Sequence, residues 1–418
     1  MKNFTGTPSI NRLLDQIVKK GLDRKIYSDI TDQAGNQYVD LVQEGGGVLG
    51  IALAGYAWIL EQCGIRFFSL AGTSAGAINT LLMASLAPVG EPVSEKITGI
   101  FGRTDLSVFV DGHPRITGLI RRYTEGRPFF KFFVFLNSFR IWRVLRRHLG
   151  LNPGTGFEMW LEECLRDAGI ETLSDLREIR GRIPVLYDRG NDNAEISRVP
   201  GLQIIASDIT TKSKIVFPEM AELYWKDPEQ VNPAGFVRAS MSIPYFFYPY
   251  RVDNIPGAGK REERRQPGSS SGWKRHAGYY GEIPETVYFV DGGLLSNFPI
   301  NAFHISTGIP KKPTFGVKLS AWRKSYSKIT TPGNMTAAMV ATMRQLHDYD
   351  FLVRNPDYNR LICHIDADTG YNWLDFGMDA ETQSALFLLG AEKAVQFLEK
   401  FDWQEYKEIR KNRHPGPV

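Results

Sequence analysis

The segment GTSAG (72–76) sets one hydroxyl between two glycines in a G-x-S-x-G pattern. An apolar run precedes it and another follows it, so the pattern predicts a sharp turn between a strand and a helix. A serine on such a turn is lifted above the sheet edge, where the Ala75 amide and the helix N-terminus favour negative charge. The pattern predicts that Ser74 is a nucleophile, supported by Gly72 and Gly76, with a purely structural turn as the alternative.

A second glycine-rich stretch, EGGGVLG (44–50), follows a predicted strand. Consecutive glycines can point several backbone N–H groups into one cavity, because no Cβ blocks the approach. The letters also fit the dinucleotide pattern G-x-G-x-x-G, but such a site needs an acid about 20 positions on, after the next strand. Here the next strand ends at Ser74. The stretch therefore predicts an oxyanion site rather than a nucleotide site or a plain tight turn, with these candidate residues: Gly45, Gly46, Gly47 and Ala75 as donors, and Gly50 as support.

Asp291 follows the apolar run VYFV and precedes Gly292 and Gly293. A buried strand would deliver this carboxylate to a loop, and burial would raise its pKa towards that of a useful base. Seven histidines offer another base, and His304 and His364 follow Asp291 in the order Ser, Asp, His of the α/β-hydrolase triad. A His-assisted esterase therefore remains an alternative. No H-E-x-x-H or acidic calcium loop is present, so we expect neither metal nor cofactor.

The elements that must position these residues alternate between strands and helices. Strands are predicted at 37–43, 66–72, 182–188, 202–209, 213–218, 286–293 and 314–320, and helices at 8–22, 50–64, 77–87 and 380–400. Short connections between them predict a three-layer α/β/α fold with a mainly parallel central sheet. We expect a helical extension at 1–36, a main domain at 37–400 and a tail at 401–418, with a helical cap at 88–200 and a flexible loop at 254–286 inside the main domain.

The composition of the 418 residues excludes some partners and favours others. A net charge of +4 is too small to indicate nucleic acid. Three distant cysteines and no apolar leader or 18-residue apolar run predict a cytoplasmic protein that meets membranes only from the surface. Residues 121–148 hold eight Arg or Lys, one acid and eight aromatics, a content that fits a plain helical cap and also a lid or a peripheral membrane contact, so both interpretations stay open.

Together the glycine loop, the elbow and the Asp-Gly-Gly segment resemble the patatin-like phospholipases. The segments 204–217, 239–249 and 295–300 are similar to that family too, and the likeness extends over 38–87 and 200–320, and more faintly over 360–400. It implies a Ser–Asp dyad of Ser74 and Asp291, an oxyanion loop at Gly45 to Gly47, and hydrolysis of acyl esters of membrane lipids without a cofactor.

One position departs from that pattern. The family usually has Arg or Lys at the fifth position of the glycine loop, where this chain has Leu49. This departure favours, as an alternative, a catalytically weak lipid-binding or regulatory protein on the same fold. The sequence leaves open the acyl position, the head group, a homo-oligomer and an activator.

Overall fold

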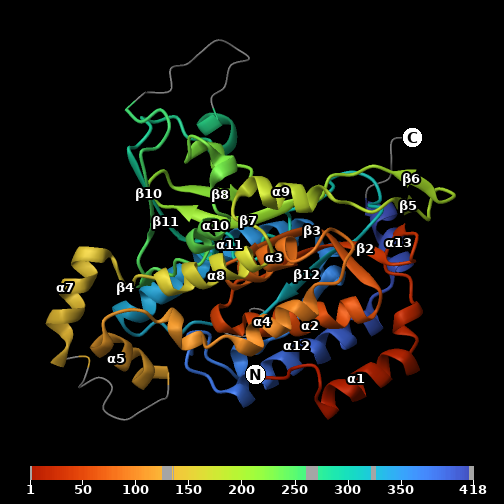
Figure 1. Cartoon of the computed structure of the whole chain (residues 1–418), viewed down its shortest axis with the longest axis horizontal. Coiled ribbons are helices and arrows are strands. Elements are labelled where there is room, and N and C mark those ends of the chain that lie inside the picture. The colour runs from red at the N-terminus through yellow and green to blue at the C-terminus, as the bar shows by residue number, and fades with distance from the viewer. Residues whose placement is uncertain (1, 125–133, 135, 260–271, 322–325, 414–418) are drawn as a thin grey trace.

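A central β-sheet organises the chain (Figure 1). The computed structural model describes residues 2–124, 134, 136–259, 272–321 and 326–413. The strands are β1 (Ile30–Asp32), β2 (Gln37–Gln43), β3 (Ile65–Thr73), β4 (Gly150–Asn152), β5 (Leu186–Asp188), β6 (Ala194–Ile196), β7 (Leu202–Asp208), β8 (Ser213–Phe217), β9 (Tyr245–Phe247), β10 (Tyr250–Asp253), β11 (Thr286–Asp291), β12 (Thr314–Lys318) and β13 (Ile362–His364). Within the described residues, β4 and β9 pair separately, and the other strands form an 11-stranded sheet.

The middle of the sheet is parallel and its edges are antiparallel. Parallel pairing runs from β13 through β12, β2 and β3 to β7. The strands β1, β5 and β6 extend one edge in antiparallel fashion, and β8, β10 and β11 do the same beyond β7. The predicted α/β fold with a mainly parallel central sheet is thus confirmed.

Eight of the helices named below form two packed groups around the sheet. The bounds of the described helices are α1 (Pro8–Lys19), α2 (Ile51–Gln62), α3 (Ala75–Ser85), α4 (Ser94–Arg103), α5 (Pro114–Thr124), α7 (Ser138–His148), α8 (Thr155–Asp167), α9 (Leu173–Gly181), α10 (Ala234–Ser240), α11 (Pro332–Arg354), α12 (Ala380–Lys400) and α13 (Trp403–Arg413). The helices α1, α2, α4 and α12 pack together, and α3 packs with α8, α9 and α10. The axes of α2 and α12 lie close because Gly55 and Gly390 face the other helix; a Cβ at Gly390 would lie 1.9 Å from the Ala52 carbonyl oxygen.

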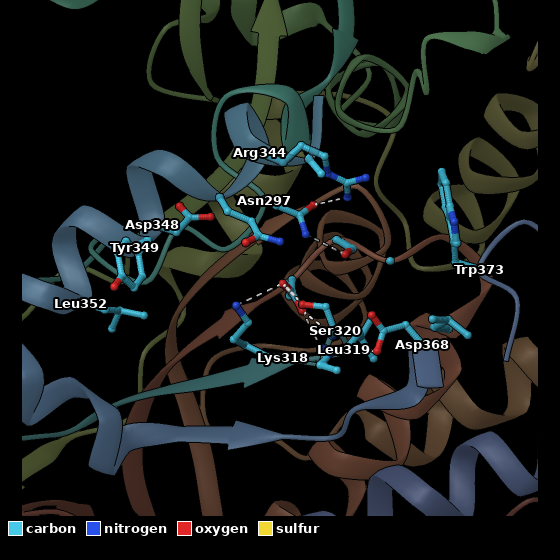
Figure 2. Close-up of a pocket in the computed structure, with 17 residues that line it drawn as sticks. Asn297, Lys318, Leu319, Ser320, Arg344, Asp348, Tyr349, Leu352, Asp368 and Trp373 are labelled. Atoms are coloured by element: carbon cyan, nitrogen blue, oxygen red, sulfur yellow. Dashed lines mark hydrogen bonds and ion pairs between the residues drawn. The ribbon is translucent and has the colours of Figure 1, made fainter. Parts of the chain in front are cut away.

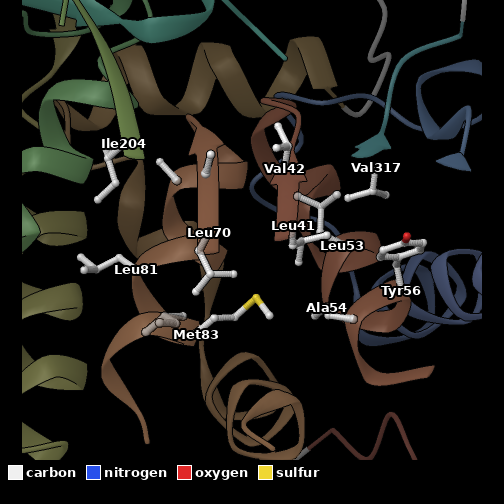
Figure 3. Close-up of a cluster of buried hydrophobic side chains, with 14 of the residues drawn as sticks. Leu41, Val42, Leu53, Ala54, Tyr56, Leu70, Leu81, Met83, Ile204 and Val317 are labelled. Carbon is white, nitrogen blue, oxygen red and sulfur yellow. The ribbon is translucent and has the colours of Figure 1, made fainter. Parts of the chain in front are cut away.

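The hydrophobic core lies between the parallel strands and these helices (Figure 3). Leu41 and Val42 of β2, Leu70 of β3 and Val317 of β12 are fully or almost fully buried there. Side chains of α2 and α3 pack on them, and burial of this apolar surface is the main source of stability for the sheet. The core therefore fixes the positions of β2, which ends at the glycine loop, and β3, which ends at the elbow.

The two ends of the chain pack on the main body. Helix α1 begins at the cap Thr7, whose hydroxyl accepts from the Ile10 amide, and it packs against α12. Strand β1, inside the predicted extension 1–36, joins the sheet, and α13, inside the predicted tail, buries Trp403. Packing thus continues across the expected boundaries at 36 and 400.

The predicted cap and loop are described in part. In the described part of the range 88–200, helices α4, α5, α7, α8 and α9 occur together with β4, β5 and β6, and the last two extend the sheet. In the predicted loop 254–286, residues 260–271 lie outside the described part, and a short helix at Trp273–Ala277 follows them. Residues 125–133 and 135 of the segment 121–148 also lie outside it.

Candidate active site

Ser74 occupies the turn between β3 and α3. Its backbone has φ 53° and ψ −118°, a strained conformation for a residue with a side chain, and it directly precedes the first turn of the helix. The glycines on either side permit this turn: a Cβ at Gly72 would lie 2.3 Å from the Gly76 carbonyl oxygen. A Cβ at Gly76 would meet the Gln43 carbonyl oxygen at the same distance. The elbow predicted from G-x-S-x-G is therefore formed, with Ser74 almost fully buried.

The register of β7 brings Ser74 and Asp291 together. Strands β3 and β11 pair with successive parts of β7 and run towards each other, since β3 is parallel and β11 antiparallel to it. Thr73 pairs with Ile205 and Asp291 pairs with the next residue, Ala206. The nucleophile and the carboxylate thus stand at the meeting point of two strand ends. The sequence predicted this strand for Asp291, but not its antiparallel direction.

Asp291 is a buried carboxylate with few but specific neighbours. Burial raises the pKa of Asp291 above its ordinary value, and the nearby charge of Arg344 opposes that rise. Hydrogen bonds from the Ser74 hydroxyl and the Gly293 amide also lower the pKa of Asp291. The Gly293 amide donates to the Asp291 Oδ1 at 2.7 Å. The carboxylate is therefore a stronger base than an exposed aspartate, yet it is held in place for Ser74.

The glycine loop lies beside the elbow, and its amides are not equivalent. The Gly45 N–H donates to the Asn297 carbonyl oxygen at 3.0 Å, so we correct the prediction that it is a free oxyanion donor. Gly47 has φ +56°, and a Cβ there would lie 2.2 Å from the Trp373 carbonyl oxygen. Within the described part of the chain, the amides of Gly46, Gly47 and Ala75 make no hydrogen bond, and they remain the candidate donors.

Gly50 and Gly292, both predicted to support the site, each lie in close contact with a neighbouring residue. A Cβ at Gly50 would lie 3.1 Å from the Ala75 Cβ, so the loop and the elbow are in contact there. A Cβ at Gly292 would lie 2.0 Å from the Ile205 carbonyl oxygen, which requires a glycine directly after Asp291. Leu49 is buried in the core cluster and borders a pocket behind the loop.

Several residues that sequence reasoning missed hold this arrangement. The Ser240 hydroxyl accepts from the Ser74 amide at 2.9 Å and donates to the Ile205 carbonyl oxygen at 2.5 Å. The Ser242 carbonyl oxygen accepts from the Asp291 amide at 2.8 Å. Both serines lie in the segment 239–249, whose likeness to the family was the only signal for them.

Asn297 and Arg344 connect the glycine loop to Asp291. The Asn297 amide donates to the Gly45 carbonyl oxygen at 3.1 Å, and its Oδ1 accepts from Arg344 at 2.9 Å. The Arg344 guanidinium also lies 5.9 Å from the centre of the Trp373 ring. Arg344 of α11 therefore places a positive charge beside the glycine loop. The patatin-like phospholipases usually carry such a charge within the loop itself, at the position of Leu49.

Two pockets lie on either side of the glycine loop. An apolar cavity of about 50 Å³ reaches Ser74 and Ala75. Its other walls are mainly large apolar side chains: Phe101, Leu106, Phe109, Phe157, Trp160, Met241, Ile243 and Phe376. A larger pocket of about 220 Å³, lined by both polar and apolar side chains, lies on the other side, and Figure 2 shows Arg344 and Asn297 together in it, with Lys318, Ser320 and Asp368 opposite.

The contacts of His304 and of Asp291 give little support to a His-assisted esterase. His304 shares a hydrogen bond of 2.8 Å with the Tyr358 hydroxyl and stacks edge-on against Phe351. The groups that shift the pKa of Asp291 are Arg344, Ser74 and Gly293, and none of them is a histidine.

The fold and the elbow are those of a mixed α/β protein with a strained strand-to-helix turn, and the comparison with protein families identifies the class as a family of lipid hydrolases. Residues 41–304 match the family described as patatin-like phospholipase, so this chain belongs to that family. It is 29% identical over 368 residues to the uncharacterized protein YqhO of Bacillus subtilis (strain 168), a match that covers 88% of this chain and all of the relative. Among solved structures, VipD from Legionella pneumophila is similar over 90% of this chain and 71% of its own, with 17% identity and a TM-score of 0.42.

No helix in the described residues has both the length and the apolar character needed to cross a bilayer.

Proposed function

We propose that this protein hydrolyses acyl esters of membrane lipids, as a phospholipase A or lysophospholipase, through a Ser74–Asp291 dyad. The observation that carries the proposal is the position of Ser74. It stands on a strained elbow at the end of an apolar cavity and interacts with a buried carboxylate. Lipid ester hydrolysis needs a nucleophile, a base, an oxyanion site and a cavity for a hydrocarbon chain.

The reaction follows from these positions in two halves. The Ser74 Oγ attacks the ester carbonyl carbon while Asp291 takes the hydroxyl proton. The amides of Gly46, Gly47 and Ala75 donate to the oxyanion. Collapse of the intermediate breaks the bond to the alcohol, which receives the proton from Asp291 and leaves an acyl-serine. A water molecule then loses a proton to Asp291, attacks the acyl carbon and releases the fatty acid, and the proton returns to Ser74.

The apolar cavity supports an acyl chain as the group held beside Ser74. Its walls contain aromatic and aliphatic side chains and almost no polar surface, which matches a fatty-acyl chain and disfavours a charged head group. The cavity is small, so we expect activity to depend on acyl length. A series of p-nitrophenyl esters from C2 to C16 measures this dependence directly.

A substrate panel with matched variants tests the dyad. Wild type, Ser74→Ala, Asp291→Asn and His304→Ala are compared on p-nitrophenyl esters and on lysophospholipid and diacyl phospholipid. Ser85→Ala is the control, since this buried hydroxyl in α3 donates to the Leu81 carbonyl oxygen of its own helix. We expect loss in the first two variants and retention in the last two; activity that survives Ser74→Ala would refute the proposal.

The same panel separates the alternatives. A catalytically weak or silent lipid-binding protein, which the apolar Leu49 favours, would bind vesicles and hydrolyse the esters very slowly or not at all. A His-assisted esterase would lose activity in His304→Ala and keep it in Asp291→Asn.

We further propose that α7 brings the protein to anionic membranes from the cytoplasmic side. Four arginines and no acid lie in this helix, and its Phe139 and Trp142 are exposed. Arg143 lies over the Phe139 ring at 4.9 Å and Arg146 over the Trp142 ring at 5.2 Å, so cations and aromatic rings share one surface. Co-sedimentation with anionic vesicles should fall when Arg143, Arg146 and Arg147 are changed to Glu; unchanged binding would exclude the contact.

A further inference from the structure

Helix α11 has two faces with opposite surroundings. One face packs on the site: Ala341, Arg344 and Gln345 line the larger pocket, and Asp348 accepts from the Ser296 hydroxyl at 2.9 Å and the Phe298 amide at 2.8 Å. The other face points away from the protein. It carries Met335, Met339, Met343, Leu346 and Val353, which we call the apolar face of α11.

The apolar face is solvent-exposed to an unusual degree. Its five side chains keep 45% to 63% of their surface exposed, at spacings of four, four, three and seven residues, which align them on one side of the helix. The exposed ion pair of Asp350 and Arg354 lies on this side in the second half of the helix, so the face is without charged side chains in its first half. A helix that packs on a protein with one side normally presents charged residues on the other. Here the 12 residues from 332 to 343 contain no Asp, Glu, Lys or Arg at all.

We propose that the apolar face of α11 inserts into the interfacial region of a phospholipid bilayer, and so brings the active site to its substrate. The delivery of the active site to its substrate depends on the proposed function. The membrane contact itself is argued from the geometry of α11 and does not depend on catalysis. An exposed helix without charge around its whole first half suits a hydrocarbon environment, in which each charged side chain is strongly disfavoured. Methionine side chains are flexible and fit an irregular apolar surface such as lipid chains.

A second copy of the chain is the competing occupant, and the flanks of the face disfavour it. Helix pairs that bury such a stripe usually carry charged residues beside it, which fix partner and register. The residues beside the apolar face in its first half are Thr336, Ala337, Val340 and Thr342. A protein interface would also have a polar rim, whereas here the first charged residue of the helix is Arg344.

Charge on neighbouring elements complements an anionic bilayer. Lys328 lies exposed before the helix, and α7 offers arginines with exposed aromatic rings. In Figure 1, α11 runs from the middle of the molecule towards the side on which α5 and α7 lie. Strand β4 follows α7 directly and pairs with β9, where Phe246 stacks on Phe376 of the apolar cavity.

The segment 373–376 joins the lipid-facing helix to the site. Trp373 lies beneath the Arg344 guanidinium, and its carbonyl oxygen accepts from the Val48 amide in the glycine loop at 3.1 Å. Phe376, three residues on, lines the cavity that reaches Ser74. A lipid drawn from a bilayer at α11 would therefore enter beside the loop and the nucleophile.

Vesicle binding of a non-hydrolysing protein tests this surface apart from the chemistry. In a Ser74→Ala background, Met335→Glu/Met339→Glu should bind zwitterionic phosphatidylcholine vesicles about tenfold or more weakly, because both charges would have to enter the interface. The matched control is Val185→Glu/Val199→Glu, which adds the same charge at two exposed valines elsewhere. It should bind as the background does.

A fluorescent probe and a soluble ester complete the test. The native cysteines, Cys63, Cys164 and Cys363, are all buried, so Met339→Cys can be labelled with an environment-sensitive dye; its emission should shift to the blue on vesicles. With Ser74 intact, the Met335/Met339 variant should keep its rate on p-nitrophenyl butyrate and lose rate on vesicle lipid.

Three results would overturn the inference. One is unchanged vesicle binding by the double glutamate variant, and another is a dye whose emission does not change on vesicles. The third is a wild-type dimer, seen by light scattering, that the glutamates dissociate while vesicle binding persists, since the occupant would then be a second copy. A wild type inactive on soluble ester refutes the proposed function alone, because the binding measurements do not need catalysis.

Discussion

The elbow and helix α11 are both parts of the candidate site, but they are held in opposite ways. Around Ser74 the backbones are so close that a Cβ at Gly72, Gly76 or Gly292 would overlap a carbonyl oxygen. The first half of α11 instead exposes most of its side chains. On the proposals above, the two regions have different tasks: tightly packed backbone would fix Ser74 and Asp291, and the projecting helix would contact lipid and place the charge of Arg344 near Asp291.

The largest effect should come from the reacting groups themselves. Ser74→Ala and Asp291→Asn should each lower kcat/KM on a soluble ester by about 10³-fold or more, because the nucleophile or its base is gone. Unchanged melting temperatures would show that the loss is chemical. A residual rate within tenfold of wild type in Asp291→Asn would mean that another group serves as the base.

Crowding at the elbow should appear as lost stability. Gly72→Ala should lower the free energy of unfolding by about 1–3 kcal/mol or more, because its Cβ would lie 2.3 Å from the Gly76 carbonyl oxygen. Gly99→Ala in α4 is the control: no atom lies within 4 Å of its Cβ, and alanine favours a helix by about 0.5–1 kcal/mol. Urea titrations of both variants measure the contrast, and equal stabilities would contradict the close packing.

The support of the elbow by Ser240 should have an intermediate effect. Ser240→Ala removes the acceptor of the Ser74 amide and the donor to Ile205, leaving buried polar groups unpaired at a cost of about 1–3 kcal/mol. We expect lower kcat with little change in KM, because the nucleophile is displaced while the apolar cavity remains. Ser85→Ala, whose bond is local to α3, should leave both constants near wild type.

The electrostatic contribution of α11 should be the smallest. Arg344 lowers the pKa of Asp291, and Asp291 acts as a base only when ionised. Without that charge the pKa of Asp291 rises, so Arg344→Gln should move the acidic limb of the kcat/KM profile to higher pH. Arg354→Gln, an exposed arginine of the same helix paired with Asp350, should leave the profile in place. A profile that stays in place for Arg344→Gln as well would remove α11 from the electrostatics of the site.

The same contrast explains what the sequence could and could not predict. The elbow was predictable because its geometry demands glycine at fixed positions beside Ser74, and the fold followed from strands and helices of clear pattern. The strand before Asp291 was visible too, but its direction depends on pairing with β7, which no local pattern encodes.

Residues that act from a distance gave no such signal. Arg344 lies 53 positions after Asp291 in a helix whose apolar residues occur on both sides, so neither spacing nor periodicity pointed to it. The sequence also could not predict which backbone amides are hydrogen-bonded. Gly45 and Gly46 are the same residue type, yet it is the Gly45 N–H that donates to the Asn297 carbonyl oxygen.

The hydrogen bond from the Ser74 amide to Ser240 also has a meaning during synthesis. The two residues are 166 positions apart, so a ribosome adding about 5–20 residues per second makes Ser74 roughly 10–30 s before the serine that accepts its amide hydrogen bond. Asp291 emerges later still. On the proposed mechanism, a nascent chain thus carries Ser74 without the groups that would make it reactive, and the dyad is complete only once Asp291 has been added.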